Sequence, residues 1–134
     1  MLKTYRGSCH CGRVKFEADI DLAAGTGRCN CSFCSKSRAW NATIKPQSLR
    51  LLCEESDMNE YLFNTMNVHH RFCPTCGLHA YSEGDIAEIG GAFVSVNIAV
   101  LDDVSPEELA SLPVHYADGL HDNWMNQPKI TSYL

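Results

Sequence analysis

The chain has 134 residues, a net charge of −5 and eight cysteines, and this length fits one domain that buries roughly two-thirds of its surface on folding. Its acidic balance, without a long Lys/Arg cluster, argues against DNA or RNA as a ligand, and no apolar run approaches the roughly 20 residues that span a bilayer. Because no hydrophobic signal segment follows the first residues, we expect a cytoplasmic protein, in which cysteines bind metal more often than they form disulfides.

Short strands account for most of the first half of the chain. Polar and apolar residues alternate strictly over 13–20, which predicts a half-buried strand, and the residues after it, 21–27, are expected to turn. A loop that carries three cysteines follows. Segments rich in β-branched and aromatic residues predict further strands at 39–44, 49–53, 61–63, 69–72 and 79–82. We expect the segments 61–63 and 69–72 to pair as a hairpin.

The second half contains the most apolar stretch of the chain, 92–101, which is rich in β-branched residues and is predicted to be the central core strand. A serine N-cap at Ser105, a first-position Pro106 and a glutamate at the capping-box position, Glu108, predict a helix of about two turns. The sequence therefore predicts a mainly β fold with a short C-terminal helix, in a single domain that spans residues 1–134. The core motifs lie within residues 7–101, and the C-terminal segment, 102–134, is expected to be irregular apart from the helix.

Most of the cysteines fall into three groups that are spaced like metal ligands. The groups are the N-terminal pair Cys9 and Cys11, the triplet Cys29, Cys31 and Cys34, and the central pair Cys73 and Cys76. Short gaps let neighbouring sulfurs face one ion, and the glycines that follow at Gly12 and Gly77 free the backbone where amides turn toward thiolates. The remaining cysteine, Cys53, is predicted to be a small packing residue beside Leu51 and Leu52.

The sizes of these groups favour two metal sites with different roles. A structural zinc needs four ligands, and the N-terminal and central pairs together supply four. The triplet supplies three, and three protein ligands with one open position are typical of a reactive zinc. Other arrangements stay open: Cys53 or a histidine could complete the triplet, or the triplet could exchange a ligand with either pair. A metal-free redox role is a further alternative for the triplet or for the central pair.

Three motifs, taken in order, resemble a known family. They are Gly7-Ser8-Cys9-His10-Cys11-Gly12, Cys29-Asn30-Cys31-Ser32-Phe33-Cys34 and Arg71-Phe72-Cys73-Pro74-Thr75-Cys76-Gly77. Together they look like the glutathione-dependent formaldehyde-activating enzyme family, also called the centromere-protein-V/formaldehyde-activating domain. The resemblance covers Gly7 to Leu101 and, more loosely, residues 118–124. It implies an Mss4-like, β-tent fold with zinc knuckles at strand ends and two zinc ions per chain.

The resemblance also implies roles for the cysteines and an activity. The structural zinc would be bound by Cys9, Cys11, Cys73 and Cys76, and the catalytic zinc by Cys29, Cys31 and Cys34. The implied activity is that of a carbon–sulfur lyase, which joins a small thiol, glutathione, and a small aldehyde, formaldehyde, reversibly as S-hydroxymethylglutathione. The alternative is a zinc-stabilised binding module without catalytic turnover. The sequence predicts no particular oligomeric state.

Side chains near the cysteines supply further candidates. Lys36 and Arg38 are the cations nearest to the triplet in the sequence, although such residues are typical of solvated loops. Phe33 and Trp40 are expected either to line a pocket or to pack in the core. Histidines near the ligands are candidate hydrogen-bond donors or proton carriers, and they are His10, His69, His70 and His79.

Overall fold

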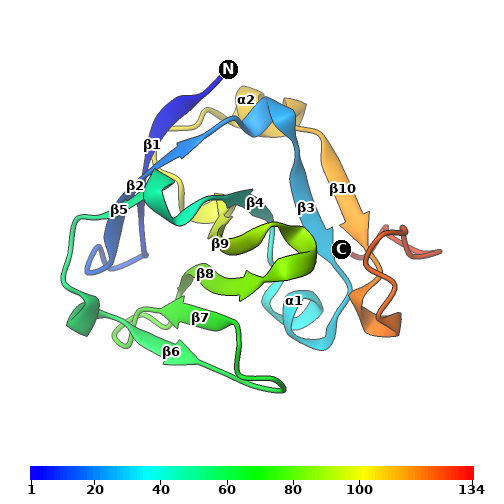
Figure 1. The fold of residues 1–134 in the computed structure, drawn as a ribbon. Helices are drawn as coiled ribbons and strands as arrows, with labels where there is room; N and C mark the ends of the chain where they lie inside the picture. Colours follow the sequence, from blue (N-terminus) through cyan, green and yellow to red (C-terminus); the bar gives the residue numbers. More distant parts are fainter.

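A computed structural model describes residues 1–134 as two β-sheets with two short helices (Figure 1). The strands are β1 Lys3–Ser8, β2 Lys15–Ile20, β3 Thr26–Cys29, β4 Asn41–Ile44, β5 Leu49–Leu51, β6 Asn59–Tyr61, β7 His69–Phe72, β8 His79–Ile86, β9 Gly91–Asn97 and β10 Val114–Ala117, and the helices are α1 Ser32–Ser37 and α2 Pro106–Ser111. The smaller sheet has the strand order β1-β2-β5, and the larger sheet has the order β10-β3-β4-β9-β8-β7-β6. Neither helix is long and apolar enough to cross a membrane.

The hydrophobic core lies between the two sheets. Strand β2 alternates as predicted, and it buries Phe16 and Ile20 with at most 2% of either residue exposed. The Phe16 ring meets Tyr81 of β8 edge to face, with the ring centroids 6.1 Å apart. From the larger sheet, Val94 and Val96 of β9 contribute buried side chains to the same core. Because each such side chain contributes roughly 1.5–3 kcal/mol on burial, the packing of one sheet on the other stabilises the fold.

The face of the larger sheet that points away from this core is polar. Residues that pair directly across neighbouring strands share a face, and the residues before and after them point the other way. Thr43 of β4 pairs with Ser95 of β9, and Ser95 pairs with Ser82 of β8. Their neighbours Ala42 and Val96 are buried in the core. The strand registers define this polar face as Cys29, Asn41, Thr43, His70, Ser82, Ser95, Asn97 and His115.

Most of the predicted strands are present, and the mainly β architecture with cysteine groups at strand ends is confirmed. The predicted hairpin is also present, because β6 pairs with β7. Its first strand is displaced toward the N-terminus, since β6 ends at Tyr61, where the predicted strand begins. Strand β9 lies in the middle of the larger sheet, as expected for the central core strand. It ends at Asn97, earlier than predicted, because a 3-10 turn over 98–100 takes the chain out of the sheet.

The short C-terminal helix, α2, begins as predicted. Ser105 Oγ accepts a hydrogen bond from the backbone N–H of Glu108 at 3.1 Å, and Pro106 occupies the first turn. The phenolic oxygen of Tyr5 in β1 donates to a carboxylate oxygen of Glu108 at 3.0 Å. This hydrogen bond ties the helix to the smaller sheet.

Four elements, β1, β3, α1 and β10, are not predicted from the sequence at all. Strand β3 and helix α1 replace the expected turn and loop around the triplet, and β10 lies in the segment expected to be irregular. Strand β10 pairs in parallel with β3, and Thr26 Oγ donates to the backbone carbonyl of Pro113, 87 positions away, at 2.6 Å. Local propensity does not reveal a pairing of such long range. Helix α1 escaped prediction because its N-cap is the sulfur of Cys31, which is not a usual capping group.

Candidate functional site

Two distant segments of the chain bring four cysteines together in the four-cysteine cluster, which consists of Cys9, Cys11, Cys73 and Cys76. Their sulfur atoms all lie within 4.8 Å of one another. The Cys11 sulfur is 3.7 Å from the Cys9 sulfur and 3.6 Å from the Cys73 sulfur. A tetrahedral zinc with Zn–S bonds of about 2.3 Å holds its sulfurs about 3.8 Å apart, so this donor set fits a structural zinc.

Backbone N–H groups are directed at the sulfurs of this cluster. The N–H of Val14 donates to the Cys9 sulfur at 3.2 Å. The backbone N–H of Cys11 is the main cause that lowers the pKa of Cys76 to about 6. Gly77 adopts a φ of 76°, a conformation that favours glycine over any residue with a Cβ. The turns around the cluster therefore stabilise thiolates, which are the form of cysteine that binds metal.

The triplet forms a second cluster at the junction of β3 and α1, and its sulfurs also lie within 4.8 Å of one another. The backbone N–H of Cys31 donates to the Cys29 sulfur, and that of Cys34 donates to the Cys31 sulfur, each at 3.3 Å. Hydrogen bonds from the thiols of Cys29 and Cys34 lower the pKa of Cys31. Three soft donors from one short segment fit zinc, and they leave a tetrahedral ion one position for a ligand from outside the protein.

The structure therefore brings together the two groups of cysteines expected from their spacing. No histidine or carboxylate joins the triplet at the same range, and Cys53 belongs to neither cluster. Cys53 is half-buried and packs against the core, as predicted, although its neighbour Leu52 is exposed. All of the cysteines are free of disulfides.

Two histidines share one serine hydroxyl at the polar face. Ser82 Oγ lies 2.7 Å from Nδ1 of His70 and 2.8 Å from Nε2 of His79. In a regular strand, positions 79 and 82 face opposite sides of the sheet, but the register of β7 and β8 shifts between Arg71 and Phe72. A hydroxyl that donates its proton to one imidazole can accept a proton from the other. The relay His70–Ser82–His79 can therefore carry a proton between two rings.

Burial keeps both imidazoles of this relay neutral at pH 7. Burial lowers the pKa of His70, and burial together with the nearby His70 lowers the pKa of His79 to about 4. A thiolate at Cys31 acts in the opposite direction and raises the pKa of His70. The His70 ring thus lies within electrostatic reach of the triplet.

The low pKa of His79 predicts a loss of stability in mild acid. Its pKa falls from 6.5 to about 4 on folding, so the unfolded chain binds more protons between these two pH values. The free energy of unfolding is therefore insensitive to His79 above pH 6.5. It decreases as the pH falls toward 4, by about 3 kcal/mol in total. We expect urea denaturation from pH 7.5 to 5 to show about 2 kcal/mol of this loss in the wild type and a smaller loss in His79→Gln. Parallel pH dependences of the two proteins would contradict the assignment, since release of metal by acid affects both.

Phe33 places the triplet helix α1 against the polar face. Its ring centroid lies 4.0 Å from that of His70 and 5.7 Å from that of Phe63. Phe63 stacks on His70 at an interplanar angle of 12°, and Tyr61 stacks on Phe63 at 5.5 Å. These side chains form an aromatic wall beside the triplet, so Phe33 lines the site rather than the core.

None of the other candidates from the sequence hydrogen-bonds to a sulfur of the triplet, although Arg38 lines a small pocket together with Cys29 and Cys34. His69 hydrogen-bonds to a carboxylate of β6 at 2.7 Å, and His10 is exposed beside the four-cysteine cluster. Lys36 is exposed, and Arg38 donates to a backbone carbonyl near the C-terminus at 2.7 Å. Trp40 packs against the core. Lys36 therefore behaves as the solvated charge that the sequence suggested, whereas Arg38 is tied to the C-terminal segment.

The C-terminal segment closes over the triplet from the side of β10. Asn30, which lies between two triplet cysteines, donates to Asp118 Oδ1 at 2.9 Å and accepts from the backbone N–H of Leu120 at 2.9 Å. Asp118 also bonds to Nδ1 of His121 at 2.9 Å. Hydrogen bonds from Asn30 and then from His121 hold the pKa of Asp118 below its usual range. The roles of Asn30 and Ser82 are not visible in the sequence, because the partners of a buried polar side chain are distant along the chain.

Gly119 provides a test of this closure. A Cβ at this position would lie 2.6 Å from both the Cys29 sulfur and the Trp124 ring. We expect Gly119→Ala to displace Cys29 and to lower the metal content of the triplet, at a cost in stability of about 1–3 kcal/mol. Gly27→Ala is the matched control, since its Cβ meets nothing closer than 3.7 Å. Equal metal content in both variants, measured by elemental analysis, would contradict the prediction.

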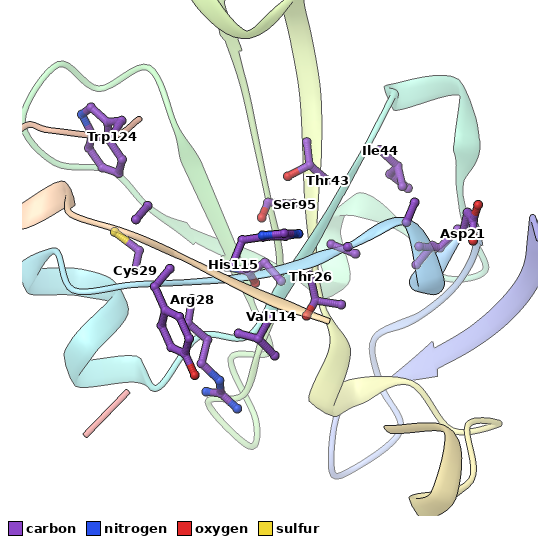
Figure 2. A pocket seen from close by; sticks show the side chains of 18 of the residues that line it. Asp21, Thr26, Arg28, Cys29, Thr43, Ile44, Ser95, Val114, His115 and Trp124 are labelled. Carbon is purple, nitrogen blue, oxygen red and sulfur yellow. The ribbon is translucent and has the colours of Figure 1, made fainter. Parts of the chain in front are cut away.

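A groove with a volume of about 1060 Å³ opens beside the triplet (Figure 2). Cys29 and Trp124 line one end of the groove, and Asp21 lines the other end. Between them lie side chains of the polar face, including Thr43 and His115. Small-molecule sites have volumes of roughly 300–1,000 Å³, so the groove is large enough for a substrate that extends well beyond the triplet.

Comparison with known proteins agrees with the three cysteine motifs. A crystal structure of a Rhodobacter sphaeroides protein is similar to this chain, with 32% sequence identity and a TM-score of 0.69, over 82% of this chain and 99% of that one. The sequence model of the glutathione-dependent formaldehyde-activating enzyme family matches residues 4–117. This match confirms the resemblance and extends it into β10. The chain therefore belongs to the glutathione-dependent formaldehyde-activating enzyme family.

Proposed function

We propose that the protein is a zinc-dependent carbon–sulfur lyase-type enzyme that forms or cleaves a thiol–aldehyde adduct. Its substrates would be glutathione and formaldehyde, and its product S-hydroxymethylglutathione. The triplet carries this proposal, because its three sulfurs lie within 4.8 Å of one another and one of its members, Cys29, lines a large groove. Family membership supports the choice of substrates. A reducing, cytoplasmic location would keep the thiols reduced.

Each cysteine cluster has its own role in this proposal. Cys9, Cys11, Cys73 and Cys76, whose sulfurs cluster, would hold a structural zinc, and Cys29, Cys31 and Cys34 would hold the catalytic zinc. Zinc bound with one open position lowers the pKa of a substrate thiol, so that its thiolate is available at neutral pH. The three cysteine thiolates outweigh the charge of one zinc ion, which favours binding of a thiol over polarisation of a carbonyl.

The residues around the triplet then handle one proton. The thiolate sulfur bonds to the aldehyde carbon, and the carbonyl oxygen takes up the proton that the thiol has released. We assign the transfer of this proton to the His70–Ser82–His79 relay, because Phe33 packs His70 against the triplet helix. Cleavage of the adduct runs along the same path in reverse. Holding thiol and aldehyde together supplies most of the rate enhancement.

Exchange NMR tests the proposed activity directly. Formaldehyde is mixed with glutathione, and in parallel with a panel of other small thiols, in the presence and absence of the zinc-loaded protein. We expect the protein to accelerate exchange between free formaldehyde and the glutathione adduct. The absence of acceleration with every thiol would remove the enzymatic proposal.

The metal content is a separate test. Protein purified without added metal is expected to contain two zinc ions per chain by elemental analysis, one for each cluster. One zinc, or none with the fold intact, would contradict the assignment of the two clusters. Zinc replaced by another transition metal in the native protein would contradict the choice of metal.

A further inference from the structure

Backbone hydrogen bonds reach every clustered cysteine except one, Cys34. In the triplet, the sulfurs of Cys29 and Cys31 each accept a backbone N–H at 3.3 Å. In the four-cysteine cluster, every sulfur accepts at least one backbone N–H, and the donors belong to Cys11, Arg13, Val14, Thr75, Cys76 and Leu78. No backbone N–H donates to the Cys34 sulfur, which therefore differs from the other sulfurs of both clusters.

This difference makes Cys34 the most nucleophilic sulfur of the triplet. A hydrogen bond to a thiolate withdraws charge from the sulfur and makes it less basic, and the intrinsic nucleophilicity of a thiolate falls with its basicity. A metal-bound thiol is deprotonated outright, so the triplet cysteines of zinc-loaded protein are all thiolates. The hydrogen bonds then set the order in which these thiolates react with an electrophile, and they leave Cys34 first.

A small cavity, distinct from the large groove, lies beside Cys34. Cys34 and Cys29 line this cavity together, whereas Cys34 does not line the groove. Tyr133 of the C-terminal segment forms another part of the cavity wall. The cavity volume is about 10 Å³, which is roughly the space of one water molecule. A reagent that reaches Cys34 from this side must therefore be very small.

Two arginines, Arg28 and Arg38, also line this cavity. Arg38 ends α1 with a φ of 57°, and its backbone N–H bonds to the carbonyl of Cys34. This left-handed conformation is unfavourable for a residue with a Cβ, so the fold holds Arg38 beside Cys34 at a cost. Neither cavity arginine is paired with a carboxylate, because the arginines that form salt bridges are Arg6, Arg13, Arg50 and Arg71. Two such cations stabilise negative charge that develops beside the Cys34 sulfur.

We propose that Cys34 is an oxidation site for hydrogen peroxide, the smallest of the hydroperoxides. The Cys34 sulfur bonds to one peroxide oxygen as the O–O bond breaks, and the other oxygen leaves as hydroxide beside the two arginines. The sulfur loses two electrons and becomes a sulfenic acid, while the peroxide gains them. The hydroxide takes a proton from solvent and becomes water. This inference goes beyond the proposed function, because it needs neither the thiol nor the aldehyde.

Cys31 is placed to convert this sulfenic acid into a disulfide. Cys31 is the N-cap of α1, Cys34 lies three positions later in its first turn, and their sulfurs lie within 4.8 Å of each other. The Cys31 thiolate attacks the Cys34 sulfur, so that the S–S bond forms, the S–O bond breaks and a second hydroxide leaves and takes a proton from solvent. The disulfide removes two of the three triplet ligands, and the triplet loses its zinc. The four-cysteine cluster, whose sulfurs all accept backbone N–H groups, keeps its zinc.

Mass spectrometry of the zinc-loaded protein tests the site of oxidation. The wild type is treated with equimolar hydrogen peroxide in the presence of dimedone, which labels sulfenic acids. We expect dimedone on Cys34 before any other cysteine. Without dimedone, we expect a disulfide between Cys31 and Cys34, and the release of one of the two zinc ions to a chromogenic chelator. First labelling of Cys29, Cys31 or Cys53, or simultaneous release of both zinc ions, would overturn the proposal.

The cavity also predicts selectivity for the size of the oxidant. Cumene hydroperoxide contains the same O–O bond but carries a bulky aryl group. The labelling rate with each oxidant is divided by the rate of that oxidant with free cysteine, which corrects for intrinsic reactivity. We expect the corrected rate with cumene hydroperoxide to be at least about tenfold lower than with hydrogen peroxide. Equal corrected rates would show that the oxidant does not enter through the cavity.

Arg38→Gln and Lys36→Gln separate the cavity from a general effect of charge. Each removes one positive charge near the end of α1, but Lys36 is exposed and does not line the cavity. We expect labelling of Cys34 to slow about 3- to 10-fold in Arg38→Gln and to stay unchanged in Lys36→Gln, with a cooperative thermal transition in both. Equal rates in the two variants would contradict the role of Arg38.

The exchange assay keeps this inference separate from the proposed function. Labelling of Cys34 in a protein that accelerates no exchange removes the proposed activity and leaves the oxidation site. Acceleration by a protein that is labelled first at another cysteine removes the oxidation site and leaves the activity.

Discussion

Replacing Cys73 with serine is expected to unfold the domain. Cys73 is fully buried, and its sulfur lies 3.6 Å from that of Cys11, 62 positions away. Structural zinc contributes about 10–16 kcal/mol in zinc-finger peptides, which is as large as the whole stability of a typical domain. We expect the variant to lose its cooperative thermal transition, followed by circular dichroism, and to retain no tightly bound zinc in the four-cysteine cluster.

Cys53→Ser is the matched control for this prediction. It makes the same chemical change at a half-buried cysteine that belongs to neither cluster. We expect a cooperative transition with a small decrease in Tm and a full complement of two zinc ions. If Cys73→Ser unfolds as cooperatively as Cys53→Ser and at a similar temperature, the four-cysteine cluster is not structural.

Replacing Cys31 with serine is expected to abolish activity and to leave the fold intact. Cys31 is the N-cap of α1, and its sulfur accepts a hydrogen bond from the backbone N–H of Cys34. Serine is among the preferred N-cap residues, so its hydroxyl can take over this hydrogen bond and the helix is kept. Serine is a poor zinc ligand at neutral pH, and the zinc content should fall from two to one. Exchange of formaldehyde with glutathione should slow by at least about 100-fold.

The comparison of these two variants also distinguishes the two functions considered from the sequence. Loss of activity with an unchanged thermal transition in Cys31→Ser supports a catalytic triplet. Unfolding of Cys31→Ser to the same extent as Cys73→Ser would make the triplet structural as well. That result would favour the zinc-stabilised binding module over the enzyme.

The cysteine clusters and the core strands could be predicted because their signals are local. The spacing of Cys29, Cys31 and Cys34 brings their sulfurs together where β3 ends and the first turn of α1 begins. The alternation over 13–20 gives β2, since each apolar residue of a half-buried strand must face the core. Ser105 and Glu108 mark the start of α2 through a hydrogen bond that spans three positions.

The parts that could not be predicted depend on contacts between distant residues. Strand β3 contains a glycine and lacks clear alternation, and it is a strand because β10 and β4 pair with it. Ser82 looks like an ordinary strand residue until His70 and His79 approach its hydroxyl from two neighbouring positions of the sheet. The unpaired state of the Asn41 side-chain oxygen is apparent only in the three-dimensional structure, which buries this oxygen without a hydrogen-bond partner.

The parallel pairing of β3 with β10 has a consequence for the order in which the two clusters are completed during synthesis. All residues of the four-cysteine cluster have left the ribosome once Cys76 has emerged, whereas β3 still lacks its edge partner. Asn30 also lacks Asp118 at that stage. A nascent chain that stops before β10 therefore presents three neighbouring thiols on an open sheet edge, where they are accessible to oxidants. Completion of the C-terminal segment is thus the step that protects the triplet.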